Sequence, residues 1–294
     1  MPRGTPVKPA PFDYHCPGEL AEAIAILQRH GDEAKVLAGG QSLIPLLSLC
    51  LSRFEHLVDL RAIEELHGIM AVDGSIRVGA MTTQANVTRS QDAAAVPLLA
   101  KATSHIGHHQ IRNRGTLGGS LAHADPAAEY PAVAIAVDAS LEVVGPNGSR
   151  RIPAGKFFMS TWVTAMAPDE VLVAAHFPVW PGSCGWAVDE VARRAGDFAM
   201  CGTVCGIQLD GQRVSRVALA LFGVDSVPLR ARATESALIG AAVDDLDLPD
   251  IGAAVAATLD PPGDLHASAG QRRRMAKALV PRVLATAINE AKHA

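Results

Sequence analysis

Apolar positions near the start of the chain fall on a helical stripe, and short apolar runs follow it. Leu20, Ile24 and Leu27 lie on one face at helical spacing, which predicts a helix over residues 19–28. The runs 35–38 and 56–60 are short and apolar, as strands are. The pattern therefore predicts a small β-α-β unit that ends near residue 61.

A second group of elements follows and ends at a proline- and glycine-containing segment, 179–183. Residues 76–80 alternate like a strand, and the hydroxyls of Thr82 and Thr83 are typical caps for a helix that begins near Gln84. Further along, the pattern predicts helices over 97–105 and 127–137, a hairpin around 146–148 and a strand over 171–177. Pro126 suits the first turn of the second of these helices.

The pattern changes after this segment. Two strand-like runs, 200–209 and 213–222, meet at Asp210-Gly211, a strong hairpin signal. Helices then dominate, over 231–239, 251–259 and 271–292. We therefore expect an N-terminal domain over residues 1–181, with subdomains of about 1–61 and 62–181, and a C-terminal α+β domain over 182–294.

Composition narrows the class of protein. The chain has 294 residues and a net charge of -4, which argues against a nucleic-acid binder. No apolar stretch reaches the ~18–20 residues of a membrane span. The segment Met1–Pro6 lacks the apolar run of a secretory signal, so a cytoplasmic location is expected. The five cysteines include no CxxC pair, so we interpret them as packing residues and predict neither a zinc site nor an iron–sulfur cluster.

The segment 38–42, Ala-Gly-Gly-Gln-Ser, directly follows a predicted strand. Two adjacent glycines allow positive φ and leave no side chain to block a ligand. Successive backbone N–H groups in such a turn form a concave anion site, and a helix that begins near Leu43 adds a favourable partial charge. A Gly-Gly pair after a strand is also a common tight turn, and the G-x-G-x-x-G pattern of dinucleotide-binding folds is absent.

Residues 116–120, Thr-Leu-Gly-Gly-Ser, repeat this order of an apolar residue, two glycines and a hydroxyl, and predict a second turn. Two such turns in separate units indicate a ligand with two adjacent phosphates held between them. A dinucleotide pyrophosphate fits that description.

Polar residues flank the second turn. Arg112 and Arg114 before it either face phosphate or lie in a solvated loop. His123, Asp125 and Glu129 follow it, but no further ligand stands at helical spacing, so we predict no metal. A carboxylate at this place would instead accept hydrogen bonds from ribose hydroxyls.

Four segments appear in the order of a known family: 38–43, 79–83 (Gly-Ala-Met-Thr-Thr), 106–125 and 193–199 (Arg-Arg-Ala-Gly-Asp-Phe-Ala). With them, essentially the whole chain closely resembles the FAD-binding medium subunits of molybdenum hydroxylases. The carbon monoxide dehydrogenase medium subunit and the flavin domain of xanthine dehydrogenase belong to this family.

The resemblance implies a fold, a function and partners. The implied fold is α+β, with a two-subdomain α/β FAD-binding domain of the PCMH type and a C-terminal α+β domain that has a three-stranded antiparallel sheet and helices. The implied function is electron transfer from [2Fe–2S] clusters on a small partner subunit, through FAD, to NAD, a quinone, oxygen or another acceptor. A large subunit with a molybdenum cofactor would oxidise the substrate, and the expected assembly is a dimer of heterotrimers.

The resemblance also implies cofactor contacts. The two glycine segments would hold the FAD pyrophosphate, Glu129 rather than Asp125 would bind the ribose or adenosine, and Phe198 would lie near the isoalloxazine. The full set of implied FAD contacts is Val36, Leu37, Ala38, Gly39, Gly40, Gln41, Ser42, Leu43, Ile106, Thr116, Leu117, Gly118, Gly119, Ser120, Glu129, Leu172, Asp189 and Phe198. No residue is predicted to act as a catalytic acid or base.

The chain departs from the family at two of these positions. Asp189 stands where Lys or Gln is common, and Ser120 stands where Asn is common. The cysteine-bearing insertion of the related 4-hydroxybenzoyl-CoA reductase subunit is absent, so no cluster is expected on this chain.

Two other functions remain open. A self-sufficient flavin oxidase or reductase of the same fold is one, although such oxidases often attach FAD through a His or Cys at the place of Gln41. A flavin-free scaffold subunit is the other, although it would not need intact glycine segments.

Overall fold

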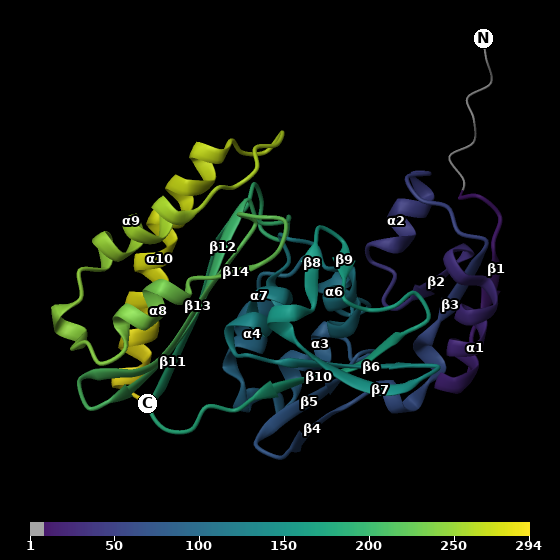
Figure 1. The fold of residues 1–294 in the computed structure, drawn as a ribbon, viewed down its shortest axis with the longest axis horizontal. Helices are drawn as coiled ribbons and strands as arrows, with labels where there is room; N and C mark the ends of the chain where they lie inside the picture. Colours follow the sequence, from purple (N-terminus) through teal and green to yellow (C-terminus); the bar gives the residue numbers. More distant parts are fainter. Residues whose placement is uncertain (1–8) are drawn as a thin grey trace, which may run out of the picture.

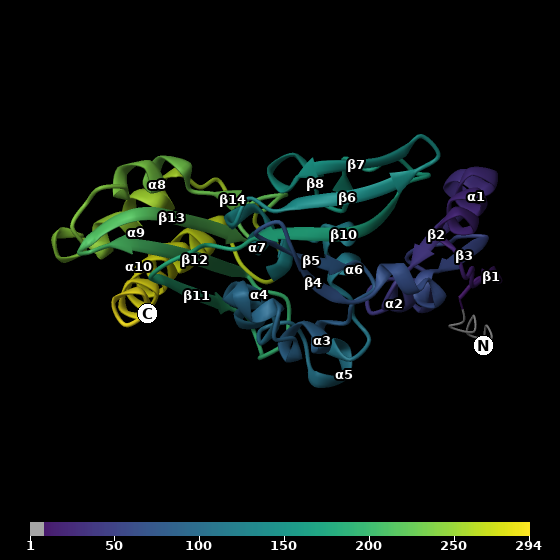
Figure 2. The same cartoon turned by 90° about the horizontal axis from the view of Figure 1, so that it is seen from below.

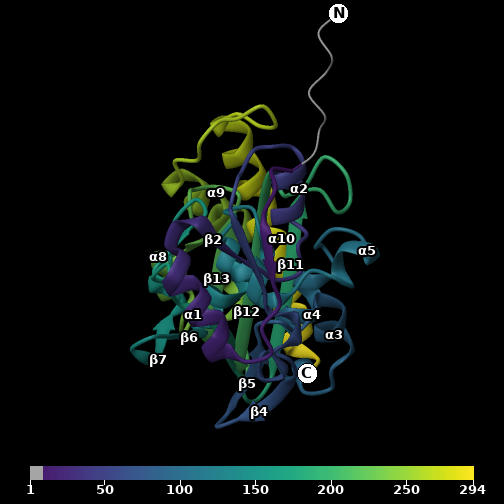
Figure 3. The same cartoon turned by 90° about the vertical axis from the view of Figure 1, so that its right-hand side faces the viewer.

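The computed structural model describes residues 9–294, so the prediction for Met1–Pro6 lies outside the described residues. Three units, each with its own sheet, lie in a row along the longest axis (Figure 1). The N-terminal unit lies at one end of this row and the C-terminal unit at the other, and Figure 3 views the row from its N-terminal end. The predicted mixture of helices and strands is confirmed.

The N-terminal unit is a parallel sheet in the order β1-β3-β2, packed against a helix. Helix α1 buries Ile24 and Leu27 of the predicted stripe, together with Ala23, and Leu20 is partly buried against the same core. The helix extends two residues beyond its predicted end. The sequence does not predict β1, because none of its three residues is buried and no apolar pattern marks it. The elements are β1 (Asp13–His15), α1 (Leu20–His30), β2 (Ala34–Leu37), α2 (Leu43–Ser48) and β3 (His56–Asp59).

The central unit is an antiparallel sheet in the order β4-β5-β10-β6-β7, with helices α3 to α7 and the small hairpin β8–β9. Thr83 caps α3 as predicted, since its side chain accepts the N–H of Asn86. The elements are β4 (Ile69–Val72), β5 (Ser75–Gly79), α3 (Gln84–Arg89), α4 (Pro97–Thr103), α5 (His109–Arg112), α6 (Leu117–His123), α7 (Glu129–Ala136), β6 (Ser140–Gly145), β7 (Gly148–Pro153), β8 (Phe158–Ser160), β9 (Val163–Thr164) and β10 (Val171–Pro178).

Helix α7 begins later than the sequence pattern predicts. The side chain of Asp125 accepts the N–H of Ala127, and its carbonyl accepts the N–H of Ala128. These bonds form a turn, so Pro126 precedes the helix instead of opening it. All eight residues of α7 are buried, because the helix packs on α4 and α6 and also on β12 and β13 of the C-terminal unit.

The C-terminal unit is an antiparallel sheet, β11-β12-β13-β14, grouped with helices α8, α9 and α10 (Figure 2). The expected three strands are present, and the two-residue strand β14 adds a fourth that is too short to leave a sequence pattern. The elements are β11 (Cys184–Val191), β12 (Cys201–Asp210), β13 (Arg213–Phe222), β14 (Leu229–Arg230), α8 (Arg232–Leu238), α9 (Leu248–Thr258) and α10 (Ala269–Lys292).

Hydrogen bonds fasten the C-terminal unit to the central one. The N–H of Gly223 donates to the carbonyl of Pro126 over 2.7 Å, and Arg230 donates to the carbonyl of Ile135 over 3.1 Å. The expected boundary near residue 181 falls in the segment that connects β10 to β11. Within residues 9–294, no helix has the length and apolar character needed to cross a membrane.

Helix α10 approaches strand β11 so closely that only glycine fits at position 185. A Cβ on Gly185 would lie 2.5 Å from the backbone nitrogen of Ala291 and 2.8 Å from the carbonyl carbon of Ala287. The helix therefore rests on the backbone of the strand.

We predict that Gly185→Ala lowers the free energy of unfolding by about 1–3 kcal/mol, because overpacking forces helix and strand apart. Urea unfolding followed by circular dichroism measures the change. Gly155→Ala is the matched control, since its Cβ would meet no atom within 4 Å, and its effect should stay below ~0.5 kcal/mol. Equal stability of the two variants would contradict the close packing.

Candidate functional site

The first glycine segment connects β2 to α2, and α2 begins at Leu43 as predicted. Gly40 has a φ of 75°, a conformation that favours glycine over residues with a Cβ. The Gln41 side chain folds back and donates to the carbonyl of Gly39 over 3.2 Å. The segment is thus a tight turn with its backbone at the surface of the unit.

The backbone donors of this turn are free. In the part of the chain that the structure describes, the N–H groups of Gly39, Gly40, Gln41 and Ser42 donate to no protein acceptor. A row of unsatisfied N–H groups in consecutive residues can bind an anion without any charged side chain.

The second glycine segment is a helix start, not the predicted turn. Thr116 is the N-cap of α6, and its side chain accepts the N–H of Gly119 over 2.9 Å. The N–H groups of Leu117 and Gly118 donate to the carbonyls of Thr82 and Ala80. These backbone N–H groups are already hydrogen-bonded within the protein. The second segment therefore lacks the free N–H donors of the first.

The glycines of the second segment instead permit close packing. A Cβ on Gly118 would lie 2.6 Å from the Cα of Ala80, so glycine is needed where α6 meets the residue after β5. A Cβ on Gly119 would lie 3.3 Å from the Cβ of Ala38, in the first segment.

The two segments lie side by side, as the sequence analysis predicts. A Cβ on Gly39 would collide with the carbonyl oxygen of Arg114 and would lie 2.7 Å from the Cα of Gly115. The N-terminal and central units therefore meet backbone to backbone, and the free donors of residues 39–42 stand beside the start of α6. This is the approach that a pyrophosphate held between two units requires.

An acidic cluster lies where the central and C-terminal units meet. Glu129 opens α7 and is buried, and Glu190 on β11 has a side chain that is 7% exposed. Nδ1 of His105 lies 3.7 Å from Oε1 of Glu190. Burial raises the pKa of Glu129 to about 8, and the Glu190 charge adds to this rise. The contact with Glu190 raises the pKa of His105.

At neutral pH the cluster holds both a hydrogen-bond donor and a hydrogen-bond acceptor. Glu129 keeps its proton and can donate a hydrogen bond, whereas Oε2 of Glu190 is buried and has no hydrogen-bond partner within residues 9–294. A buried acceptor without a partner is costly for the protein. The cluster can therefore both donate to and accept from a hydroxyl-bearing ligand.

The structure brings Ile106 close to the loop that carries Phe198. A Cβ on Gly196 would lie 2.8 Å from the carbonyl oxygen of Gly107, so the two loops touch. Arg112 donates to the carbonyls of Ile106 and Gly107, each over 2.9 Å, and fixes this turn. Its NH1 group thus bonds to backbone rather than facing phosphate. Phe198 itself is 62% exposed, although it is a large apolar residue.

Other residues implied by the resemblance serve packing. Leu37, Leu117 and Leu172 are buried, the last two in the large core that spans the central and C-terminal units. Asp189 pairs with Arg282 of α10, with Oδ2 2.8 Å from the guanidinium. Its side chain is therefore turned toward α10.

Sequence reasoning missed Glu190. Successive side chains of a strand point to opposite faces, so Asp189 meets α10 while Glu190 meets His105 and Glu129. The sequence predicts that Asp189 and Glu190 point to opposite faces of the strand. It does not predict which face packs on α10 and which faces His105.

Known proteins show what this arrangement is similar to. Residues 10–180 match the family model of the FAD binding domain in molybdopterin dehydrogenase, and residues 186–287 match the CO dehydrogenase flavoprotein C-terminal domain. The carbon monoxide dehydrogenase medium chain of Hydrogenophaga pseudoflava is 38% identical over 277 residues, which cover 94% of this chain and 96% of that one.

Two further comparisons agree. The 6-hydroxypseudooxynicotine dehydrogenase complex subunit alpha of Paenarthrobacter nicotinovorans is 38% identical, with 97% of each chain covered. A solved structure of carbon monoxide dehydrogenase from Hydrogenophaga pseudoflava superimposes with a TM-score of 0.93 at 38% identity, over 96% of this chain and 99% of that one.

The buried Glu129 predicts how stability depends on pH in the protein without added ligand. The folded pKa of about 8 exceeds the ordinary glutamate value of 4.5, which the unfolded chain keeps, so between these values only the folded state holds the proton. Folding stability therefore falls as pH rises through this range, by up to ~1.4 kcal/mol per pH unit, and levels off above it.

We expect Glu129→Gln to remove this dependence. The variant should gain stability over the wild type progressively from pH 5 to pH 8, because only the wild type must desolvate or protonate a carboxylate. Urea unfolding midpoints at both pH values measure it, with Glu64→Gln, at an exposed site, as control. A difference that is constant with pH would show that Glu129 titrates normally.

Proposed function

Because the chain belongs to the family of FAD-binding medium subunits of molybdenum hydroxylases, we propose that it is the electron-transfer component of a three-subunit enzyme. Like other members it binds FAD and is an oxidoreductase component. The observation that carries the proposal is the row of free N–H groups in residues 39–42, beside the start of α6.

The first task of this chain is to hold the FAD pyrophosphate. We assign it to residues 36–43 and to Thr116, Leu117, Gly118, Gly119 and Ser120. In this assignment the free backbone donors come from the first segment. The second segment supplies a wall without side chains at its glycines, which lets the two units close around the phosphates.

The adenosine end is assigned to the acidic cluster. A protonated Glu129 donates a hydrogen bond, and Oε2 of Glu190 accepts one from a ribose hydroxyl. We add Glu190 to the site for this reason. Asp189, which pairs with Arg282, acts through the position of β11 rather than by direct contact.

The isoalloxazine is assigned to the loops of Ile106 and Phe198, and Leu172, a buried residue of the core against which Ile106 packs, is a further assigned contact. An exposed aromatic ring beside a polar loop is suited to stacking. When bound, FAD supplies the redox chemistry, and the protein contributes its position, its hydrogen bonds and its exclusion of water.

Electrons would reach this chain from [2Fe–2S] clusters on a small subunit, which receives them from the molybdenum cofactor of a large subunit. They would leave to NAD, a quinone, oxygen or another acceptor. Large apolar side chains exposed away from the assigned flavin site suit partner contacts, among them Leu49 and Leu51 after α2 and Met159 and Trp162 near β8–β9.

The substrate is chosen on another chain in this proposal. Two relatives that are equally similar, at 38% identity, carry the names of carbon monoxide and 6-hydroxypseudooxynicotine dehydrogenases. Medium subunits of this family therefore occur in enzymes that act on chemically unrelated substrates. The dimer of heterotrimers and the cytoplasmic location remain predictions.

We predict that Gly40→Ala weakens FAD binding by at least ~10-fold, since a Cβ at positive φ reorients the neighbouring N–H donors. Gly31→Ala is the matched control. It also replaces a glycine at positive φ in the same unit, but a Cβ there meets no atom within 4 Å and it lies outside the turn. Titration of the flavin-free chain with FAD, followed by flavin absorbance, measures both.

Two outcomes would count against this assignment. If the wild type takes up no FAD, the chain is a flavin-free scaffold. If Gly40→Ala and Gly31→Ala bind FAD equally well, the pyrophosphate lies elsewhere.

The partner proposal predicts that the chain purified from its native cells elutes with two further subunits and with molybdenum, iron and FAD. Native mass spectrometry and elemental analysis measure this. A chain that elutes alone and oxidises a substrate without molybdenum would instead be a self-sufficient flavin enzyme.

A further inference from the structure

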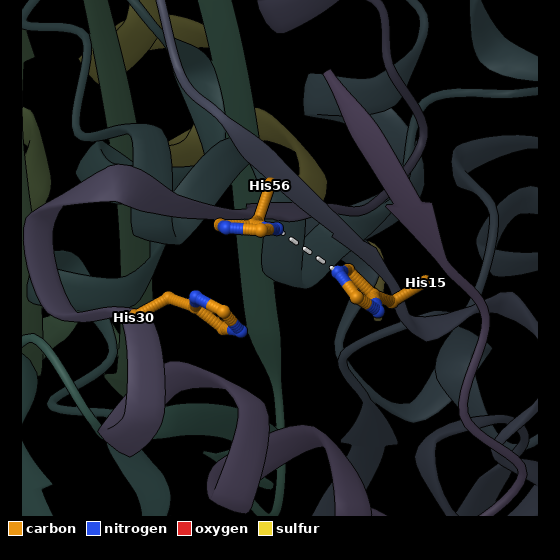
Figure 4. A group of neighbouring side chains, drawn as sticks. All are labelled: His15, His30 and His56. Atoms are coloured by element: carbon orange, nitrogen blue, oxygen red, sulfur yellow. Dashed lines mark hydrogen bonds between the residues drawn. The ribbon is translucent and has the colours of Figure 1, made fainter.

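Three histidines gather on the N-terminal unit, outside the segments assigned to FAD. His15 ends β1, His56 begins β3 and His30 ends α1. One nitrogen from each ring lies within 4.8 Å of the other two. Figure 4 shows the three rings around one common space, with His30 approaching from the helix and the other two from the strands.

The spacing of the nitrogens matches a shared ion. Nε2 of His15 lies 3.2 Å from Nδ1 of His56. In a tetrahedral zinc site with Zn–N bonds of ~2.0–2.1 Å, two ligand nitrogens lie about 3.3 Å apart. The His15–His56 pair therefore already has the separation of two ligands on one ion. The His30 ring is near both, with centroids 3.6 Å from His56 and 6.0 Å from His15.

The fold itself places these residues together. In the parallel pairing of β1 and β3, Asp13 stands opposite His56 and His15 opposite Val58. Side chains two residues apart share a sheet face, so the two histidines lie diagonally on one face. Helix α1 packs against β3, and its last residue, His30, reaches the same edge.

The electrostatics of this place favour a cation. The C-terminal end of a helix carries a partial negative charge, and α1 ends here. Asp13 adds a carboxylate, with Oδ2 3.8 Å from Nδ1 of His56. All three histidines are only half-buried, so an ion can enter from solvent.

We propose that His15, His30 and His56 bind one divalent transition-metal ion of the zinc class, with water or Asp13 at the fourth position. Neutral imidazole is a preferred ligand for zinc, nickel and copper, and three histidines with one open place are a known zinc arrangement. The ion would link β1, α1 and β3.

This site is separate from the FAD turn. The strands are parallel, and Ala34 stands opposite His56 while Leu37 stands opposite Asp59. The histidines therefore lie at the edge where β2 and β3 begin, and the glycine turn follows the edge where β2 ends. About four strand residues, roughly 10–13 Å, separate the two edges.

No metal is predicted from the sequence, and these three histidines are not singled out there, since they are far apart in the chain and match no spacing pattern. His30 and His56 meet where α1 packs against β3, and His15 joins them only through the pairing of β1, the strand that the sequence does not predict. The alternative is a hydrogen-bonded and stacked histidine cluster without an ion, and the experiment distinguishes the two.

The test uses the full chain, treated with a chelator and then titrated with zinc chloride by isothermal titration calorimetry. We expect one equivalent of zinc to bind. Mutation of a residue that only hydrogen-bonds to a metal ligand typically weakens metal binding ~10–100-fold. Because His30→Asn removes a ligand itself, it should weaken zinc binding by more than this. His266→Asn, at an exposed histidine of the C-terminal unit, is the control and should bind zinc like the wild type.

Two further measurements separate metal loss from misfolding. A hundredfold excess of zinc over its Kd should raise the Tm of the wild type by ~5 °C or more and leave that of His30→Asn unchanged. FAD binding should survive in His30→Asn, which shows that the unit is still folded. A crystal with zinc should give anomalous scattering between the three rings.

The proposal is overturned if the wild type binds no stoichiometric zinc, or if His30→Asn binds as tightly as the wild type. It is also overturned if His266→Asn loses the ion. None of these outcomes depends on FAD binding, so the two proposals can fail separately.

Discussion

The approach of Gly39 to the backbone of Arg114 and Gly115 is the contact on which the site depends. A side chain on Gly39 would occupy the place of a carbonyl oxygen. The same approach sets Ala38 beside Gly119 and leaves the N–H groups of residues 39–42 uncommitted at the seam between two units. These N–H donors are available because the hydrogen bonds of strand β2 end before them and those of helix α2 begin after them. The contact between the two units is thus both a junction of the fold and the reason why we propose this place as the ligand site.

Close backbone approach recurs through the molecule. Gly118 lies against Ala80, Gly185 lies against α10, and Gly196 lies against Gly107. Each contact joins elements that are distant in the chain, and each replaces side-chain packing with contact between main chains. With aromatic residues at only 4%, the chain relies on small residues and short separations. Such backbone contacts restrict the movement of the loops that they join. This suits a protein that must hold a cofactor in a fixed position.

Much of the fold could be predicted because local chemistry determined it. The cap of Thr83, the stripe of α1 and the hairpin at Asp210-Gly211 depend on neighbouring residues, and the structure confirms them. The misses depended on distant ones. Whether the N–H groups of Leu117 and Gly118 are free for a ligand was decided by the carbonyls of Thr82 and Ala80, which accept them. The roles of Asp189 and Glu190 were decided by what packs on each face of β11.

Helix α7 has no exposed residue, because the central unit covers one side and strands β12 and β13 cover the other. Those strands lie more than sixty residues later in the chain. While the protein is being synthesised, the central unit therefore emerges from the ribosome with an apolar face that its own residues cannot cover. Its final packing must wait until β13 has been made. The proposed FAD site, whose adenosine end we assign to a cluster that includes the first residue of α7, would mature late in biosynthesis, after the greater part of the chain has already been translated.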